Sequence, residues 1–185
     1  ALIRETLYGE LTITRRVRLH RRVGEALERL AQGSADPPLA DLAYHFVHTA
    51  SADTAGKAID YATRAGDHAA EMLAHEDAAR FYDMALQSLE FTPAGLDTEG
   101  LRSELHARRA RAFGALTQWA LQKVETERAL QHLDPRHVER RAELVQPQRQ
   151  RAQVFVAFVA HQVDRLVARE RQIVAQLRLG GRREQ

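Results

Sequence analysis

The chain has 185 residues, 44% of them apolar and 28% charged, so it is long enough to bury a hydrophobic core. It contains no cysteine, which excludes disulfide scaffolds, iron–sulfur clusters, zinc held by cysteine and thiol nucleophiles. No run of about eighteen apolar residues and no signal-peptide core occurs, so we expect a cytoplasmic protein without membrane contact. The net charge of +2 is weak support for a nucleic-acid surface.

Apolar residues recur at spacings of three and four along the chain and nowhere alternate with polar residues as in a strand, so the sequence predicts an all-α protein. Because Ala1 already stands inside such a pattern, we expect a piece of a longer protein. The next helix is predicted from Thr14, and it ends before Gly33-Ser34 and Pro37-Pro38. Its buried stripe is predicted to contain Val17, Leu19, Val23, Ala26, Leu27 and Leu30.

The next helices are predicted to pack small side chains against large ones. After a helix over residues 39–50, Ser51-Ala52-Asp53-Thr54 offers N-cap side chains for a helix that runs to about Leu73. That helix has a face of mostly small residues and the following helix, over residues 77–90, a bulky one, which favours tightly paired antiparallel helices. The first face is formed by Ile59, Ala62, Ala65, Gly66, Ala69 and Leu73, and the second by Phe81, Tyr82, Leu86 and Leu89.

Residues 92–100 are predicted to form a loop, because they contain one proline and two glycines. Helices are predicted over residues 101–116 and 119–133, with Trp119 packed in the core or between helices and Asp134-Pro135 ending the second helix. In the last third, Pro147 interrupts or kinks a helix that starts near Arg136. A long amphipathic run follows over residues 154–174, and residues 182–185 are expected to fray.

An internal repeat is indicated by three dipeptides that follow one another at an offset of 44 residues: Ala85-Leu86, Ala129-Leu130 and Ile173-Val174. The segment 58–90 resembles a tetratricopeptide repeat, since Ala85-Leu86, Tyr82, Ala78 and Gly66 match its Ala-Leu, aromatic and two small positions in one register. The second unit departs from it, with Gln122 at a small position and Thr126 at the aromatic one. The resemblance implies antiparallel helix pairs stacked as a right-handed superhelix, an α-solenoid.

A wider resemblance covers about the first 130 residues and rests on five strings of residues. They are Ala1-Leu2-Ile3-Arg4-Glu5-Thr6-Leu7-Tyr8, Arg18-Leu19-His20-Arg21-Arg22-Val23, Leu42-Ala43-Tyr44-His45-Phe46, Lys57-Ala58-Ile59-Asp60-Tyr61-Ala62 and Ala78-Ala79-Arg80-Phe81-Tyr82. These strings resemble the region downstream of the ATPase in bacterial signal-transducing AAA-type ATPases, such as large LuxR-type regulators and multidomain nucleotide cyclases.

The resemblance implies three parts and a role. Residues 1–32 would be the end of a winged-helix or linker region, residues 38–181 tetratricopeptide-like repeats, and residues 182–185 a frayed tail. The repeats would sense a protein partner or a small effector, and would relay its binding to an upstream ATPase domain of the same chain.

Signatures of catalysis are missing from the sequence. It has no phosphate-binding Gly-x-x-x-x-Gly-Lys-Ser/Thr loop, no His-Glu-x-x-His and no Gly-x-Ser-x-Gly, so we expect neither an enzyme nor a cofactor. Asp41, His45 and His48 stand at helical spacings and could form an oxygen–nitrogen metal site. We prefer a solvated helix side on which Asp41 supports His45, and therefore predict no metal.

Two arginine-rich runs raise the alternative of a nucleic-acid-binding helical domain, which would use the helix over residues 15–29. One run contains Arg15, Arg16, Arg18, Arg21 and Arg22, and the other Arg108, Arg109 and Arg111. Acidic residues such as Glu25, Glu28 and Glu104 stand near both runs, which favours a solvated or partner-docking face instead. We do not expect nucleic acid to be the partner.

Repeat arrays usually bind on their concave side, which the first helix of each pair lines. In the register above, six residues are predicted to face that side: Asp60, Thr63, Asp67, Glu71, Glu104 and Arg111. Replacing Asp67 and Glu71 with alanine is then expected to weaken partner or effector binding while leaving the thermal midpoint nearly unchanged.

Overall fold

The computed structural model describes residues 11–93, 98–137, 139–147, 150 and 153, and every regular element in them is helical. The chain divides into two compact units, Ala1–Val138 and Glu139–Gln185. The all-α expectation is confirmed for the described residues, none of whose helices has the length and apolar character needed to cross a membrane. The first unit contains α2 (Ile13–Leu30), α3 (Leu39–Val47), α4 (Ala55–Glu71), α5 (His75–Ser88), the short 3-10 helix η1 (Leu89–Phe91), α6 (Glu99–Ala115) and α7 (Trp119–Gln131).

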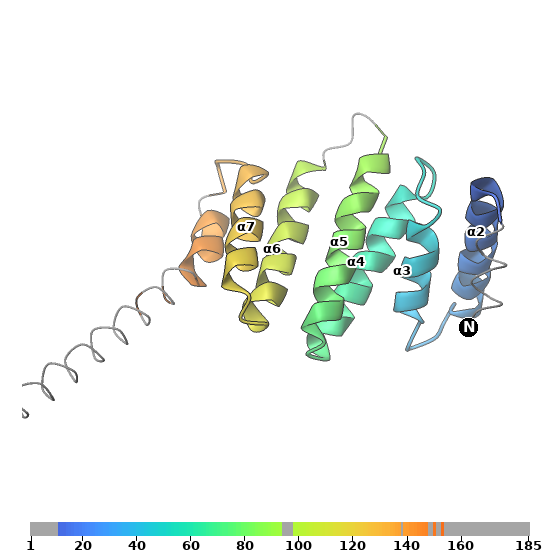
Figure 1. Ribbon diagram of the computed structural model, residues 1–185, viewed down its shortest axis with the longest axis horizontal. Coiled ribbons are helices and arrows are strands. Elements are labelled where there is room, and N and C mark those ends of the chain that lie inside the picture. The colour runs from blue at the N-terminus through green and yellow to red at the C-terminus, as the bar shows by residue number, and fades with distance from the viewer. Residues whose placement is uncertain (1–10, 94–97, 138, 148–149, 151–152, 154–185) are drawn as a thin grey trace, which may run out of the picture. The chain divides into compact units, whose positions relative to one another are not determined.

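The helices of the first unit pack mainly against their neighbours in the chain, and Figure 1 shows α2 to α7 following one another in order. The most extensive contacts join α4 to α5 and α6 to α7, while α3 packs on α4 and α5 packs on α6. Because each contact joins helices close in sequence, the order of the helices follows directly from the order of the chain.

Two helix pairs are related by an offset of 44 residues. Helices α4 and α6 both have 17 residues and begin at Ala55 and Glu99, and α5 and α7 begin at His75 and Trp119. The turn inside each pair places a residue other than glycine in the left-handed region, with φ of 60° at Leu73 and 59° at Thr117. The offset predicted from Ala85-Leu86 and Ala129-Leu130 is therefore present in the helix bounds, whereas Ile173-Val174 lies outside the described residues.

The core between α4 and α5 pairs small side chains with large ones, as the sequence predicts. Tyr82 is 3% exposed and lies against Gly66, where an added Cβ would stand 2.5 Å from Tyr82 Cε1. Gly66 is therefore required by the close approach of the two helices, and not by its backbone conformation. The surrounding core includes Ile59, Ala62, Ala65, Ala69, Ala78, Phe81, Ala85 and Leu86.

Two details of α4 correct the sequence prediction. Leu73, predicted on the buried face, stands two residues beyond the end of the helix and is 76% exposed, because the chain has already turned there. Thr54 occupies the N-cap position, but its hydroxyl donates to the carbonyl of Thr49, 2.7 Å away, instead of capping the helix. Thr54 thus fixes the preceding turn.

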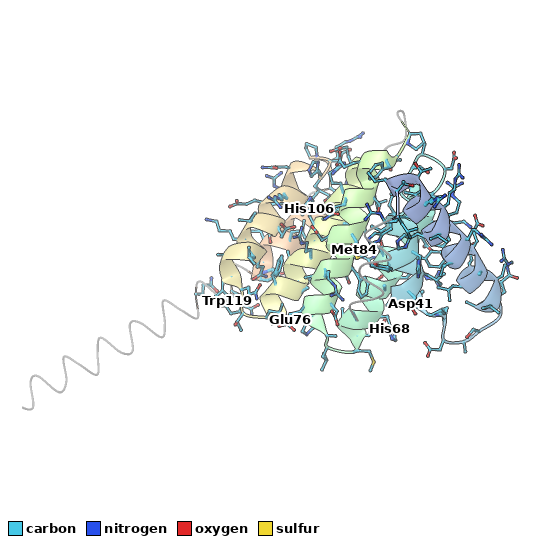
Figure 2. The ribbon with its side chains drawn as sticks, turned by 45° about the vertical axis from the view of Figure 1, so that its right-hand side comes forward. Asp41, His68, Glu76, Met84, His106 and Trp119 are labelled. Carbon is cyan, nitrogen blue, oxygen red and sulfur yellow. The ribbon has the colours of Figure 1, made fainter. Side chains whose placement is uncertain are left out.

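The prediction of a buried apolar stripe on α2 is wrong, because none of its six residues is buried. The buried residues of α2 are His20 and Gly24, whereas Leu19, Val23 and Leu30 are 45%, 40% and 83% exposed. The reason is that α3 packs against one side of α2 and leaves the side with these three residues uncovered. Trp119 is also 50% exposed at the first position of α7 (Figure 2), so of the two predicted places, in the core or between helices, the core is excluded.

The second unit is described over a short stretch. Residues 139–147 are helical, and Arg140 and Glu143 form an ion pair of 2.9 Å within that helix. Pro147 is its last continuously described residue, so a kink there lies outside the description, as do the amphipathic run over residues 154–174 and the tail over residues 182–185.

Candidate interaction surface

The six residues predicted for a binding surface lie on α4 and α6, the first helices of the two pairs. Asp60, Thr63, Asp67 and Glu71 follow one another along α4 at spacings of three and four, which places them on the same side of the helix. Glu104 and Arg111 stand on α6. The structure brings three of the six together, through an arginine that the sequence analysis assigned to another role.

Arg108 of α6 joins α4 to α6. Its guanidinium Nη1 donates to both carboxylate oxygens of Asp67, and its Nε donates to Glu104 Oε1 at 3.1 Å. Tyr82 of α5 donates its hydroxyl to Asp67 Oδ1 at 2.9 Å, and Arg111 lies 3.5 Å from Glu104. We call these five residues the Asp67–Arg108 cluster.

The carboxylates of the cluster hold the Arg108 guanidinium in its charged form. Burial by itself disfavours the charged guanidinium, but the hydrogen bonds and charges of Asp67 and Glu104 raise the pKa of Arg108. Burial raises the pKa of Tyr82 strongly, and its hydrogen bond to Asp67 adds to the rise, so this hydroxyl remains a donor. Two carboxylates face two guanidinium groups, and the cluster has no net charge of its own.

The cluster overturns one expectation about Asp67. Because Asp67 accepts hydrogen bonds from both Tyr82 and Arg108, replacing it with alanine removes contacts that join three helices. The thermal midpoint is therefore expected to fall. A substitution of Arg111 is better suited to testing the surface without loss of stability, because the Arg111 side chain is 61% exposed.

The other three predicted residues lie outside the cluster. Asp60 is exposed and pairs with Arg64 of its own helix at 3.2 Å. Thr63 is half-buried, and its hydroxyl oxygen has no hydrogen-bond partner among the described residues. Glu71 is exposed at the last position of α4. In the described part of the chain, the side chains of Asp60 and Glu71 therefore form no ion pair or hydrogen bond with another helix.

Arg108 was missed by sequence reasoning, which placed it in a run of arginines. One signal was present, since Glu104 precedes Arg108 by four residues, a spacing that brings oppositely charged side chains together on a helix. The pairing with Asp67, 41 residues away in sequence, follows only from the packing of α4 near α6.

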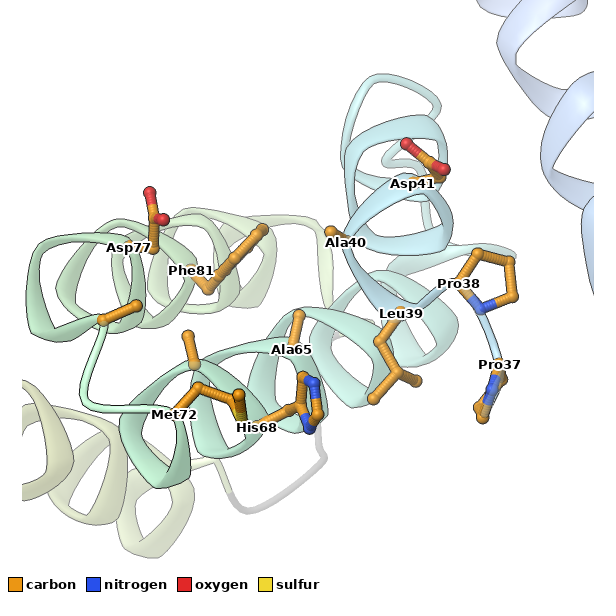
Figure 3. Close-up of a pocket in the computed structure, with 12 residues that line it drawn as sticks. Pro37, Pro38, Leu39, Ala40, Asp41, Ala65, His68, Met72, Asp77 and Phe81 are labelled. Carbon is orange, nitrogen blue, oxygen red and sulfur yellow. The ribbon is translucent and has the colours of Figure 1, made fainter. Parts of the chain in front are cut away.

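An apolar groove lies elsewhere in the same unit, where the start of α3 and the start of α5 approach α4 (Figure 3). Its volume is about 350 Å³, near the lower end of the range for small-ligand pockets. Much of its lining is apolar, and His68, Asp41 and Asp77 are its ionisable residues. The apolar lining includes Leu39, Ala65, Met72 and Phe81.

Three histidines meet where α2 packs on α3. His20 Nδ1 lies 3.0 Å from His45 Nδ1, and the ring of His20 stacks on that of His48 with centroids 4.8 Å apart. Burial first, and then the nearby His48, His45 and Arg16, lower the pKa of His20 to about 4. His45 is thus part of a helix contact rather than of a solvated side.

The metal site weighed for Asp41, His45 and His48 is not formed. The described residues contain no group of three or more histidine, aspartate or glutamate side chains placed to hold a metal ion. His48 Nδ1 donates to the carbonyl of Tyr44 at 2.8 Å, and His45 Nδ1 is engaged with His20. These two nitrogens are therefore committed to contacts within the protein.

Polar side chains hold α6 against α7, the helix pair that departs from the tetratricopeptide pattern at Gln122 and Thr126. Glu125 of α7 is buried and lies 2.7 Å from His106 Nδ1, and the position of His106 is visible in Figure 2. Burial alone would raise the pKa of Glu125, but the hydrogen bond from His106 and the charges of Arg109 and Arg128 hold it below its usual value. Arg109 also pairs with Asp83 of α5 at 2.9 Å. The arginine run of α6 is therefore paired with carboxylates of the same chain.

No known protein family, curated protein or solved structure matches this chain.

Proposed function

We propose that this chain is a non-catalytic helical-repeat module that binds a protein partner or a small effector, as part of a signal-transducing ATPase regulator. In this proposal α4 with α5 and α6 with α7 are tetratricopeptide-like antiparallel pairs within a right-handed solenoid. Each pair contacts its neighbours, so small changes of the angle between pairs add up along the array and relay binding to an attached ATPase domain.

The observation that carries the proposal is the repeated geometry of the two pairs. Both first helices have 17 residues, both pairs share the offset of 44 residues, and both turns use a left-handed residue before the second helix. The backbone contacts of the turns also agree, since Ala74 N donates to Ala69 O at 2.8 Å and Gln118 N to Phe113 O at 2.9 Å. Repeated units of this kind stack by presenting the same faces to each other.

The surface that we assign to partner binding runs along the first helices, α4 and α6. Asp60, Glu71 and Arg111 are exposed on these helices, and the Asp67–Arg108 cluster fixes the spacing between α4 and α6. Such a surface presents charges of both signs at fixed positions, which gives a partner specificity through complementary charges. The apolar groove beside α3 and α5 is the place that we assign to a small effector.

The test of the surface is the triple variant Asp60→Ala/Glu71→Ala/Arg111→Ala. Its matched control is Lys123→Ala/Glu127→Ala on α7, which removes an exposed ion pair of 3.9 Å from a second helix. Both variants should unfold in urea at the midpoint of the unchanged chain, because the altered side chains are exposed.

The immobilised chain is exposed to a bacterial lysate, and the retained proteins are quantified by mass spectrometry. We expect at least one protein to be retained by the unchanged chain and by the α7 control, and to be depleted about tenfold by the triple variant. Retention of the same proteins in the same amounts by all three chains would exclude this surface.

A further inference from the structure

The side of α2 that α3 leaves uncovered carries an apolar stripe. It consists of Leu19, Val23, Ala26 and Leu30, which stand on one side of the helix because they follow one another at spacings of three and four. The three large side chains are 45%, 40% and 83% exposed. A hollow of about 570 Å³ lies along the stripe, with the small side chain of Ala26 among its lining residues.

A row of arginines borders this stripe. Arg15, Arg18, Arg22 and Arg29 are all exposed, and on a helix of 3.6 residues per turn they fall on the side adjoining Leu19 and Ala26. None of the four forms an ion pair in the part of the chain that the structure describes. Of the two acidic residues of α2, Glu28 is bound by Lys57 at 2.6 Å and by Tyr61 at 2.8 Å. Glu25 is therefore the one acidic residue of α2 that is not bound by another helix in the described chain.

The arginines from α4 to α7 behave differently. Every one of them lies within 4.0 Å of a carboxylate of this chain, in contrast to the row on α2. They are Arg64, Arg80, Arg102, Arg108, Arg109, Arg111 and Arg128. The arginine row of α2 thus has no carboxylate partner among the described residues, whereas every arginine of α4 to α7 has one.

We propose that the outer face of α2 docks an acidic amphipathic helix of a partner protein. Leucine-like side chains of that helix enter the hollow along the apolar stripe, and its glutamates or aspartates pair with the arginine row. Arginine suits this role because a guanidinium group binds a carboxylate through two hydrogen bonds. The proposal does not depend on the surface of α4 and α6.

Two other anionic partners fit this face less well. A nucleic-acid duplex would pair with the arginine row but leave the apolar stripe in water, so it would gain nothing from Leu19, Val23 and Leu30. A membrane surface would cover the exposed leucines, but a lipid surface has no protruding side chain of fixed position to fill the hollow beside them. A helix with both apolar and acidic residues complements the two features at once.

The test uses the whole chain and two fluorescent synthetic peptides of about 18 residues. One peptide has leucines at helical spacings with glutamates beside them, and the other has the same composition in an order that scatters the leucines. Binding is measured by fluorescence anisotropy at low and at high salt. We expect the first peptide to bind about tenfold more tightly than the scattered one.

Two variants separate the charged from the apolar contribution. Arg18→Glu/Arg22→Glu/Arg29→Glu should weaken binding about tenfold or more and abolish its salt dependence. Leu19→Ser/Leu30→Ser should weaken it about tenfold at both salt concentrations while the salt dependence remains. A control with the same change of charge, Arg64→Glu/Arg80→Glu/Lys123→Glu, alters exposed side chains of α4, α5 and α7 and should change binding less than about twofold.

Several results would overturn the proposal. They are equal binding of both peptides, an equal loss in the control variant, or no loss in the leucine variant. Tighter binding of duplex DNA or of vesicles of anionic phospholipid than of the acidic peptide would assign the face to that partner instead. Peptide binding that appears only after removal of residues 1–10 would make this segment of the chain the occupant.

Discussion

The contact between Gly66 and Tyr82 is the point at which the packing of α4 on α5 can be tested most directly, by Gly66→Ala. The added methyl group would stand 2.5 Å from Tyr82 Cε1, 2.8 Å from Cδ1 and 3.1 Å from Cζ. The ring cannot turn away easily, because it is 3% exposed and its hydroxyl is bound to Asp67, which is itself held by Arg108. Forcing a methyl group into such a site costs about 1–3 kcal/mol.

The change has an opposing effect, because alanine favours helix more than glycine by about 1 kcal/mol. We therefore expect a net loss of up to about 2 kcal/mol in the free energy of unfolding, measured by urea unfolding followed by circular dichroism. The matched control is Gly56→Ala in the first turn of α4, where an added Cβ meets nothing within 4 Å. That variant should be as stable as the unchanged chain or more stable.

A double variant tests the cause of the loss. In a chain that carries Tyr82→Leu, the substitution Gly66→Ala should no longer destabilise, because the ring that the methyl group meets is gone. If Gly66→Ala is at least as stable as the unchanged chain, or if its cost is the same with leucine at position 82, the packing argument is wrong.

Three further outcomes are expected. The pKa of His20 is about 4 in the folded chain against its ordinary 6.5, so the unfolded chain binds the proton first as the pH falls. The free energy of unfolding should therefore decrease between pH 6.5 and 4, by about 3 kcal/mol at most. His20→Gln should remove this part of the pH dependence of urea unfolding. Leu73→Gly should stabilise by about 0.5–1 kcal/mol in urea unfolding, because Leu73 is 76% exposed and has a φ of 60° that glycine adopts without strain. Asp67→Ala should lower the free energy of unfolding by about 1–2 kcal/mol, since Tyr82 and Arg108 lose their acceptor, and an unchanged urea midpoint would contradict the hydrogen bonds of the cluster.

Only part of the candidate surface could be predicted from the sequence. Spacing alone placed Asp60, Thr63, Asp67 and Glu71 on one side of α4, because the period of a helix fixes which residues share a side. It could not pair Asp67 with Arg108, since this depends on the distance at which α6 passes α4. The same limit applied to Trp119 and to the stripe of α2, whose burial depends on which helices cover them.

The sequence by itself determined the helical class, the bounds of most helices to within a few residues, and the packing of a small face of α4 against a bulky face of α5. These depend on local periodicity and on matching small with large side chains along consecutive helices. The tertiary structure alone decided which charges are compensated. Arg108 and Arg109 pair with carboxylates because the packing of the helices brings Asp67 of α4 and Asp83 of α5 within reach of α6, whereas Arg15, Arg18, Arg22 and Arg29 lie on the exposed side of α2. Ion pairing joins side chains that are distant in the chain, and only packing brings them within reach.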